Sequence, residues 1–137
     1  MRLILDTNVL VSALIQRNYP YFIVDLVLAD NTLKLRISDQ LFAEYVEVLN
    51  REKFSRFSDF HARAQTLLTD LESRALKFSP SIKIDIIADD PDNRLLELAE
   101  TCQADYIITG NTNDFTMTEY KGTKIVSPKD FFELLNE

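Results

Sequence analysis

Residues 3–10 read LILDTNVL, an apolar tripeptide followed at once by a carboxylate, a hydroxyl and an amide. A short apolar run of this kind is typical of a strand buried in a parallel sheet, and the polar groups then lie at the edge where the strand ends. Ligands of open α/β sheets bind at that edge, where strands end and helices begin. We therefore expect the chemistry of this chain to begin at Asp6, with further acids at equivalent strand ends.

Predicted helices and strands alternate along the rest of the chain. Apolar spacing predicts helices over about residues 9–15, 21–28, 39–49, 59–75, 89–102 and 128–135, and strands over about residues 33–37, 105–109 and 123–126. Residues 77–87 give a weaker pattern, in which Pro80 interrupts a strand-like alternation of isoleucines. Alternating strands and helices imply right-handed crossovers and a parallel sheet covered on both faces. The predicted fold class is α/β, with three layers (α/β/α) and a central parallel sheet.

Length and composition predict a single cytoplasmic domain over residues 1–137. The chain is 46% hydrophobic, has two glycines and contains no Gly-rich or Ser-rich linker, which favours one compact unit. No stretch approaches the roughly 20 apolar residues of a membrane span, and Met1 leads directly into the first predicted strand, so we expect no membrane attachment. The single cysteine, Cys102, excludes an internal disulfide and a thiolate metal cluster, and we expect it to be a small core residue.

The formal net charge is −7, from 22 acidic and 15 basic side chains. Binding of phosphates is largely electrostatic, so this balance by itself argues against a nucleic-acid partner. A divalent cation held by several of the acids would reverse the local sign of the charge, however. The global balance would then say little about the site.

Four acids far apart in the sequence are predicted to converge at the C-terminal edge of the sheet: Asp6, Glu44, Asp92 and Asp114. Carboxylates that lie together raise one another's pKa, so a protein keeps them clustered mainly when a cation compensates their charge. Oxygen ligands without histidine or cysteine select Mg²⁺ or Mn²⁺ over zinc. The alternative is that each acid has a separate ordinary role: a turn former, a solvated helix residue, a helix N-cap and a loop acid, respectively.

Four blocks of sequence around these acids resemble those of the PIN-domain ribonuclease family. They are LDTNVLVSAL at residues 5–14, residues 38–54 with Glu44 and Tyr45, residues 89–99 with Asp92, and ADYIITGN at residues 104–111 followed by Asp114 and Phe115. The resemblance spans essentially the whole chain in order, and is greatest to bacterial PIN proteins described as toxins of toxin–antitoxin systems. It implies a PIN-like fold and a metal-dependent endoribonuclease that hydrolyses RNA phosphodiester bonds.

Carried across residue by residue, the resemblance assigns catalysis and the holding of Mg²⁺ or Mn²⁺ to Asp6, Glu44, Asp92 and Asp114. It assigns a supporting role to Thr7, Asn8, Thr109 and Asn111. The chain departs from the family pattern at Asn111: many relatives have an aspartate directly after the Thr-Gly pair, whereas here the acid follows three residues later at Asp114. The implied mechanism is hydrolysis in which one or two ions lower the pKa of a bound water and neutralise the leaving oxygen.

Basic residues near the blocks could hold RNA phosphates, and the candidates are Arg17, Arg51, Lys53 and Arg94. The alternative is that they are ordinary solvated charges. We expect Asp89 and Asp90 to be loop and cap residues. The single histidine, His61, lies far from any block and is expected at the surface, which argues against histidine-based ribonuclease chemistry.

Two other enzyme classes with an early strand-end aspartate fit less well. A haloacid-dehalogenase-type phosphatase would have its general acid two residues later, where this chain has Asn8. A receiver domain would have a lysine after a late buried strand, whereas Lys124 lies inside its predicted strand. The stronger alternative is a non-catalytic PIN-like module that binds RNA or a protein without cutting, which Asn111 and the acidic composition favour.

Two protein partners follow from the resemblance. A toxin implies a cognate antitoxin protein whose segment covers the acidic groove, and homodimers are common among relatives. An exposed apolar patch over residues 9–21, with the neighbouring Phe22, is where we expect a dimer surface.

Overall fold

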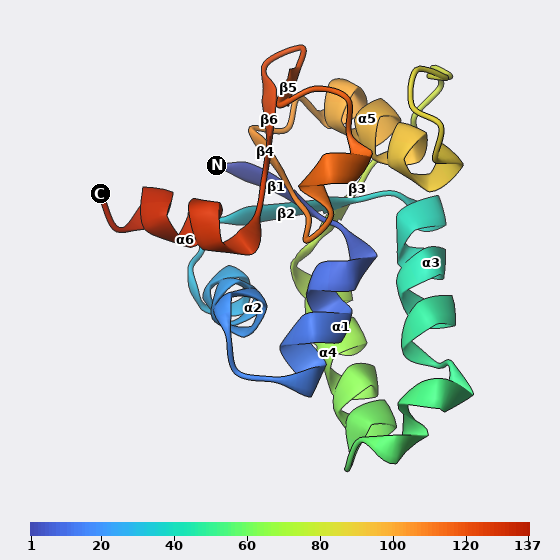
Figure 1. The fold of residues 1–137 in the computed structure, drawn as a ribbon, viewed down its shortest axis with the longest axis vertical. Helices are drawn as coiled ribbons and strands as arrows, with labels where there is room; N and C mark the ends of the chain where they lie inside the picture. Colours follow the sequence, from blue (N-terminus) through green and yellow to red (C-terminus); the bar gives the residue numbers. More distant parts are fainter.

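The computed structural model describes residues 1–137 and has a six-stranded sheet in the order β3-β2-β1-β4-β6-β5 (Figure 1). The strands are β1 (Arg2–Leu5), β2 (Lys34–Ile37), β3 (Leu76–Lys77), β4 (Tyr106–Ile108), β5 (Glu119–Tyr120) and β6 (Thr123–Val126). All neighbouring pairs are parallel except β5 with β6, which is antiparallel. The predicted α/β class with a central, mostly parallel sheet is confirmed.

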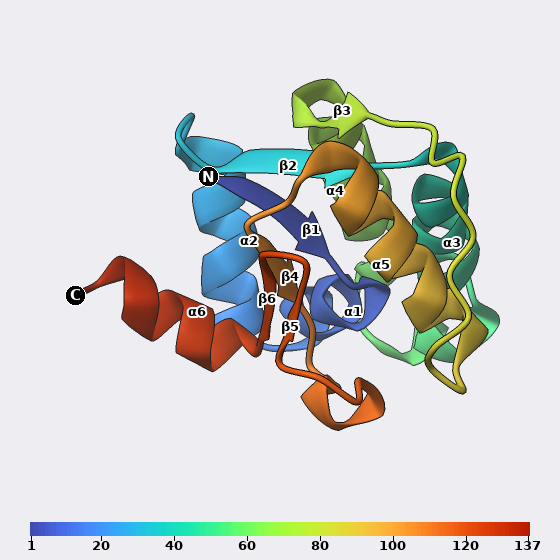
Figure 2. The same cartoon turned by 90° about the horizontal axis from the view of Figure 1, so that it is seen from above.

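Helices cover both faces of the sheet. They are α1 (Thr7–Ile15), α2 (Tyr19–Ala29), α3 (Asp39–Leu49), α4 (Phe60–Arg74), α5 (Asp90–Cys102) and α6 (Pro128–Leu135), with short 3₁₀ turns η1 (Glu52–Arg56) and η2 (Thr112–Asp114). Figures 1 and 2 show α5 on one face of the sheet and α1, α2 and α4 on the other, with α6 packed beside α2. None of these helices has the length and apolar character that a membrane crossing needs.

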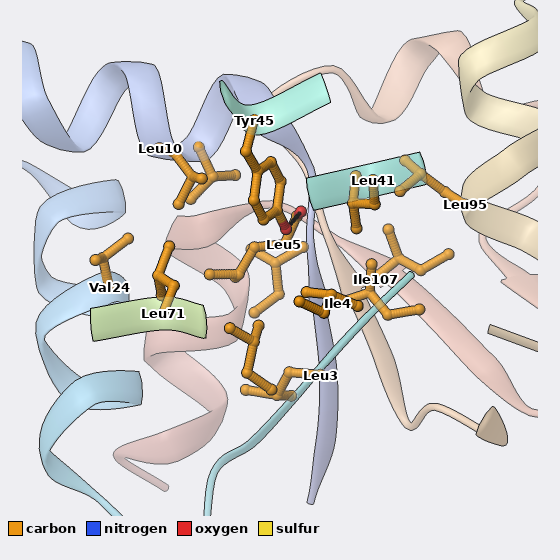
Figure 3. Packing of buried hydrophobic residues seen from close by; sticks show 14 of the residues in the cluster. Leu3, Ile4, Leu5, Leu10, Val24, Leu41, Tyr45, Leu71, Leu95 and Ile107 are labelled. Atoms are coloured by element: carbon orange, nitrogen blue, oxygen red, sulfur yellow. Dashed lines mark hydrogen bonds between the residues drawn. The ribbon is translucent and has the colours of Figure 1, made fainter. Parts of the chain in front are cut away.

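Strand β1 runs through the middle of the hydrophobic core (Figure 3). Leu3, Ile4 and Leu5 are completely buried, as are Ile107 of β4 and Tyr45 of α3. Burial on both faces of a strand requires apolar side chains at consecutive positions, which explains why this tripeptide does not alternate with polar residues. Burying one large aliphatic side chain contributes about 1.5–3 kcal/mol, so the strand that delivers Asp6 is firmly anchored.

The register of the two central strands aligns their C-terminal ends. Leu5 of β1 pairs with Ile108 of β4, and the N–H of Asp6 donates to the carbonyl of Ile108 at 2.9 Å. Asp6 and Thr109 therefore lie at the same edge of the sheet, each directly after its strand. Helix α1 begins at Thr7 with Asp6 as its N-cap, so strand and helix meet there without an intervening loop.

The weak strand-like pattern within residues 77–87 does not produce a strand after Lys77, because the chain forms no regular element between β3 and α5. Side-chain oxygens of α5 accept hydrogen bonds from backbone N–H groups of this segment. In a sheet, these N–H groups would donate to a neighbouring strand instead. The N–H of Ile84 donates to Glu97 Oε2 at 2.8 Å, and the N–H of Ile87 donates to Asn93 Oδ1 at 3.0 Å. The alternating isoleucines thus belong to an irregular segment that α5 holds in place.

The antiparallel hairpin of β5 and β6 departs from the predicted all-parallel sheet, and its turn favours glycine. Lys121 and Gly122 have φ angles of 47° and 87°, as in a two-residue type I′ turn. We expect Gly122→Ala to lower the free energy of unfolding by about 1 kcal/mol, because an L side chain disfavours this backbone conformation, although no atom lies within 4 Å of the added Cβ. Thermal unfolding measures the loss. Gly122→Asn, which tolerates a positive φ, is the control, and an equal loss in both variants would contradict this explanation.

Candidate active site

Asp6 is held by hydrogen bonds on both carboxylate oxygens. Its Oδ1 accepts the N–H of Thr7 at 2.8 Å. Its Oδ2 accepts the hydroxyl of Thr109 at 2.8 Å and the side-chain amide of Asn8 at 3.2 Å. Burial raises the pKa of Asp6 above its ordinary value and the nearby Glu44 carboxylate adds to this, while the hydrogen bonds from Thr109 and Thr7 partly oppose it. The carboxylate therefore has a fixed orientation, and a cation would relieve the cost of its ionisation.

Asn8 and Thr109 join the ends of β1 and β4. Asn8 Oδ1 accepts the N–H of Gly110 at 2.9 Å, and Thr109 Oγ1 accepts the N–H of Asn111 at 3.0 Å. A Cβ added to Gly110 would lie 3.3 Å from Asn8 Oδ1, so glycine permits the close approach of this backbone. Asn111 enters the network through its main chain.

Helix α3 brings two neighbouring residues to the same edge. Glu44 is half-buried, and the hydroxyl of Thr7 donates to its Oε2. Tyr45 is completely buried, and its hydroxyl donates to the carbonyl of Leu5 at 2.5 Å. From sequence, Tyr45 is only one residue of the apolar stripe of its helix. The signal that could identify its polar role is its place next to Glu44.

Tyr45 is expected to stabilise the strand end that carries the site. Burial, with Asp6 and Glu44 nearby, raises the pKa of its hydroxyl well above the ordinary value, so the hydroxyl stays protonated and donates. We expect Tyr45→Phe to lower the free energy of unfolding by about 1–2 kcal/mol, since a buried carbonyl loses its donor. Denaturant unfolding checks this, with Tyr21→Phe at a partly exposed position as control. A Tyr45→Phe stability equal to that of the wild type would contradict the prediction.

Asp92 is the most deeply buried of the four acids, and its surroundings disfavour a negative charge. It lies in the first turn of α5, which Asp89 caps by accepting the N–H of Asp92 at 3.4 Å. Asp92 is only 7% exposed, and its Oδ2 is buried without a hydrogen-bond partner. Burial, followed by the charges of Asp6, Asp89, Asp114 and Glu44, raises the pKa of Asp92 to about 7. A buried carboxylate oxygen without a donor is unfavourable unless a proton or a cation satisfies it.

The acidic quartet (Asp6, Glu44, Asp92 and Asp114) is close enough to interact but does not form a ready-made metal cage. Asp92 is buried, Asp6 and Glu44 are half-buried, and Asp114 is exposed on η2. No three acidic, histidine or cysteine side chains are arranged to hold a metal ion. The donors nevertheless fit a hard divalent cation, because they are carboxylate oxygens and Asp92 Oδ2 has no other partner. Binding would require the four side chains to draw together.

The predicted RNA-binding residues lie in different surroundings. Arg94 is mostly buried and forms ion pairs with Glu97 at 2.8 Å and with Asp90 at 3.1 Å. Arg51 is paired with Glu47 at 2.9 Å. Arg17 and Lys53 lie over the rings of Tyr21 and Phe54, at 5.1 and 5.2 Å. Arg94 thus has partners within the chain, and the RNA-binding role of all four stays a prediction.

Local contacts account for Cys102 and His61. Cys102 is 4% exposed and belongs to the hydrophobic core, as predicted. His61 is partly exposed, and its Nε2 lies 3.0 Å from the carbonyl of Arg51. That contact joins the start of α4 to η1, apart from the acidic quartet.

Comparisons with known proteins identify the family. A family model described as a PIN domain matches residues 2–113. An uncharacterized protein of Methanocaldococcus jannaschii is 25% identical over an alignment that covers 97% of this chain and 90% of the relative. The crystal structure of VapBC2 from Rickettsia felis, bound to a DNA fragment from the promoter, contains a chain of similar fold. That chain is 18% identical with a TM-score of 0.59, over 93% of this chain and 98% of that one. This chain belongs to the PIN domain family.

Proposed function

We propose that this chain is a divalent-metal-dependent endoribonuclease that hydrolyses RNA phosphodiester bonds. The observation that carries the proposal is the buried, unpartnered Oδ2 of Asp92, whose carboxyl group is influenced by the charges of Asp6, Glu44 and Asp114. Concentrated negative charge around an unsatisfied oxygen is characteristic of a cation site. Membership of the PIN family supports the nuclease class.

In this proposal Asp6, Glu44, Asp92 and Asp114 hold one or two Mg²⁺ or Mn²⁺ ions. Such ions lower the pKa of a bound water and neutralise charge on the leaving oxygen. The other residues fix the acids: Thr109 and Asn8 orient Asp6, and Thr7 orients Glu44. Asn111 supports Thr109 through its backbone N–H, and Asp114 supplies the fourth carboxylate. RNA phosphates are held by some of Arg17, Arg51, Lys53 and Arg94.

A non-catalytic PIN-like module that binds RNA or a protein is the second candidate function. Two observations favour it. No three potential ligands are already arranged around a metal position, and Asn111 stands directly after the Thr-Gly pair, where a carboxylate would add a ligand. A module of this kind would keep the fold and the strand-edge hydrogen bonds without binding Mn²⁺.

A cytoplasmic toxin of a toxin–antitoxin pair would have two protein partners. The likeness in fold to a chain of the VapBC2 complex supports a cognate antitoxin. The apolar patch expected over residues 9–21 is not a continuous exposed surface, because Val9, Leu10, Ala13 and Leu14 are buried in the hydrophobic core. Phe22, next to that stretch, is 40% exposed, and the ring of Phe132 lies 5.9 Å from that of Phe22 and 5.5 Å from that of Tyr19. This aromatic cluster between α2 and α6 is the proposed dimer surface. Light scattering of the purified chain tests the dimer.

Cleavage of an end-labelled single-stranded RNA tests the nuclease. We expect internal cleavage with Mn²⁺ or Mg²⁺, complete loss in EDTA, and recovery when Mn²⁺ is added in excess of the chelator. Cleavage that persists in EDTA would contradict a metal-dependent reaction. No cleavage under any condition, together with no heat of Mn²⁺ binding in calorimetry, would favour the non-catalytic module.

A further inference from the structure

A basic pocket lies at the edge of the sheet opposite the acidic quartet. Its volume is about 300 Å³, and it is lined by Asn31, Leu33, Lys34, Arg36, Ser73 and Arg74. These residues come from β2, the turn before it and the end of α4, which lie on the same side of the molecule in Figure 2. Because β1 and β2 are parallel, the start of β2 is at the N-terminal edge of the sheet. The pocket therefore begins at this edge and extends along β2 from Lys34 to Arg36.

Three cations and no acid line this pocket in a chain whose net charge is −7. Lys34 and Arg36 lie on one face of β2, alternating with the buried Leu35 and Ile37. Both point away from the core for that reason. Arg74 approaches from α4, where its Nη2 donates to Asn31 Oδ1 at 3.0 Å. Cations from a strand and a helix thus line the same basic pocket. Their mutual repulsion is unfavourable unless an anion binds between them.

Arg36 provides an independent observation. Its Nε is buried and has no hydrogen-bond acceptor within the chain. Its Nη1 reaches only the carbonyl of Leu35, at 3.3 Å, and its guanidinium lies 5.9 Å from the centre of the Phe78 ring. Nη2 has no hydrogen bond within the chain, so the guanidinium has unused donors beside two further cations. This suits an oxyanion, because a planar guanidinium binds phosphate oxygens through several donors.

Two acids, Asp30 and Glu72, are adjacent in sequence to lining residues, and neither belongs to the lining. Glu72 is paired with Lys77 at 3.0 Å. Asp30 feels the charge of Arg74, but its Oδ1 already accepts the N–H and the hydroxyl of Thr32, at 2.9 and 2.7 Å. These two bonds from Thr32 are also the main reason why the pKa of Asp30 is lowered. The Asp30 carboxylate is therefore oriented within its own turn, outside the lining of the pocket, where its single charge acts on Arg74 and leaves the three lining cations in excess.

We propose that this basic pocket binds a phosphate group, supplied either by the backbone of an RNA chain or by a free nucleotide. If RNA is the source, the proposal rests on the proposed function, and the pocket holds part of the chain away from the scissile bond. If a free nucleotide is the source, the pocket is a separate ligand site. Both cases use the same donors on Lys34, Arg36 and Arg74.

Binding measured in EDTA separates this site from the acidic quartet, since without a cation the carboxylates repel phosphate. The test variant is Lys34→Gln with Arg74→Gln, which keeps the half-buried Arg36. Lys34→Gln alone serves as a second variant, in case loss of the Arg74–Asn31 bond loosens the turn. The control, Lys83→Gln with Lys129→Gln, removes the same charge from two exposed lysines elsewhere. Fluorescence anisotropy with a labelled 12-nucleotide single-stranded RNA and calorimetry with AMP and inorganic phosphate are the readouts.

We expect the test variant to bind the RNA several-fold more weakly than the control. The logarithm of the association constant for RNA decreases with the logarithm of the salt concentration. The magnitude of this slope should be smaller in the test variant by about 1.4, or about 0.7 for each lost contact to a single strand. Weaker RNA binding by the test variant, together with no binding of AMP or inorganic phosphate by the wild type, identifies the RNA backbone as the source. Binding of AMP or phosphate that is lost in the test variant, with RNA binding unchanged, identifies a free nucleotide. Equal binding of every probe by test and control variants would overturn the proposal, whether or not the chain cleaves RNA with Mn²⁺.

Discussion

Asp6→Asn is expected to reduce metal-dependent RNA cleavage by about 10³-fold or more. Metal-assisted charge stabilisation supplies several kcal/mol to such reactions, and each 1.36 kcal/mol corresponds to a factor of ten in rate. Asp6 is the acid at the end of the most buried strand, with both oxygens held by defined donors. Asparagine keeps one oxygen for the N–H of Thr7 but loses the charge and places an amide towards Thr109 and Asn8. The metal would therefore lose a ligand whose orientation the fold has already fixed.

Single-turnover cleavage in Mn²⁺ measures this effect, with Asp130→Asn as a matched control. Asp130 lies in the first turn of α6 and is exposed, and it is not among the acids whose charges act on Asp6 or Asp92. Circular dichroism and thermal unfolding establish that both variants are folded. Cleavage by Asp6→Asn within about tenfold of the control rate would contradict a catalytic role for this carboxylate.

Asp92→Asn is expected to abolish cleavage and, at the same time, to stabilise the metal-free protein. In the folded chain the pKa of Asp92 is about 7, above the ordinary value of 3.8. Between these two values the folded state binds more protons than the unfolded state, so the stability of the metal-free protein falls as the pH rises from about 4 to about 7. Above pH 7 the full penalty of the buried charge is present. Asparagine removes that charge, and with it the pH dependence from this residue.

Differential scanning calorimetry in EDTA at pH 8 measures the gain in stability. Each kcal/mol of relief should raise the Tm by about 3–5 °C in a chain of this size. Added Mn²⁺ should reverse the order, because the wild type binds the ion more tightly than the variant and so gains more stability from it. A variant less stable than the wild type in EDTA would show that the Asp92 carboxylate has a donor in the folded chain and is no unsatisfied ligand.

The placement of Asp6 at a sheet edge can be predicted from sequence because the end of a strand and the cap of a helix coincide there. The consecutive apolar residues of β1 predict a fully buried strand. The polar residues that follow the strand are then expected at the edge of the sheet. Ser38 and Asp89 are recognisable as N-caps for the same local reason, and the structure shows their side chains accepting N–H groups of Leu41 and Asp92. These features depend on neighbours within a few residues.

The remaining features depend on contacts between distant segments. The isoleucines between β3 and α5 alternate as in a strand, yet Glu97 and Asn93 of α5 bind their backbone, which no local pattern indicates. Tyr45 looks like an ordinary core residue until the carbonyl of Leu5 is found beside its hydroxyl. Arg94 looks like a free surface cation, but its Nη2 donates to the carbonyl of Ile84 at 2.8 Å, in the irregular segment before α5. In each case a partner outside the residue's own helix or strand decides the role.

Calorimetric titration of Mn²⁺ into the wild type at pH 8 and at pH 6, beside Asp92→Asn, tests the central claim most directly. The ion and the proton compete for the Asp92 carboxylate, whose pKa is about 7. We therefore predict a saturable site whose affinity is about tenfold weaker at pH 6 than at pH 8. The variant should bind Mn²⁺ more weakly at both pH values, with less dependence on pH. Affinity that is independent of pH, or equal in the wild type and the variant, would contradict a metal site built on this acidic quartet.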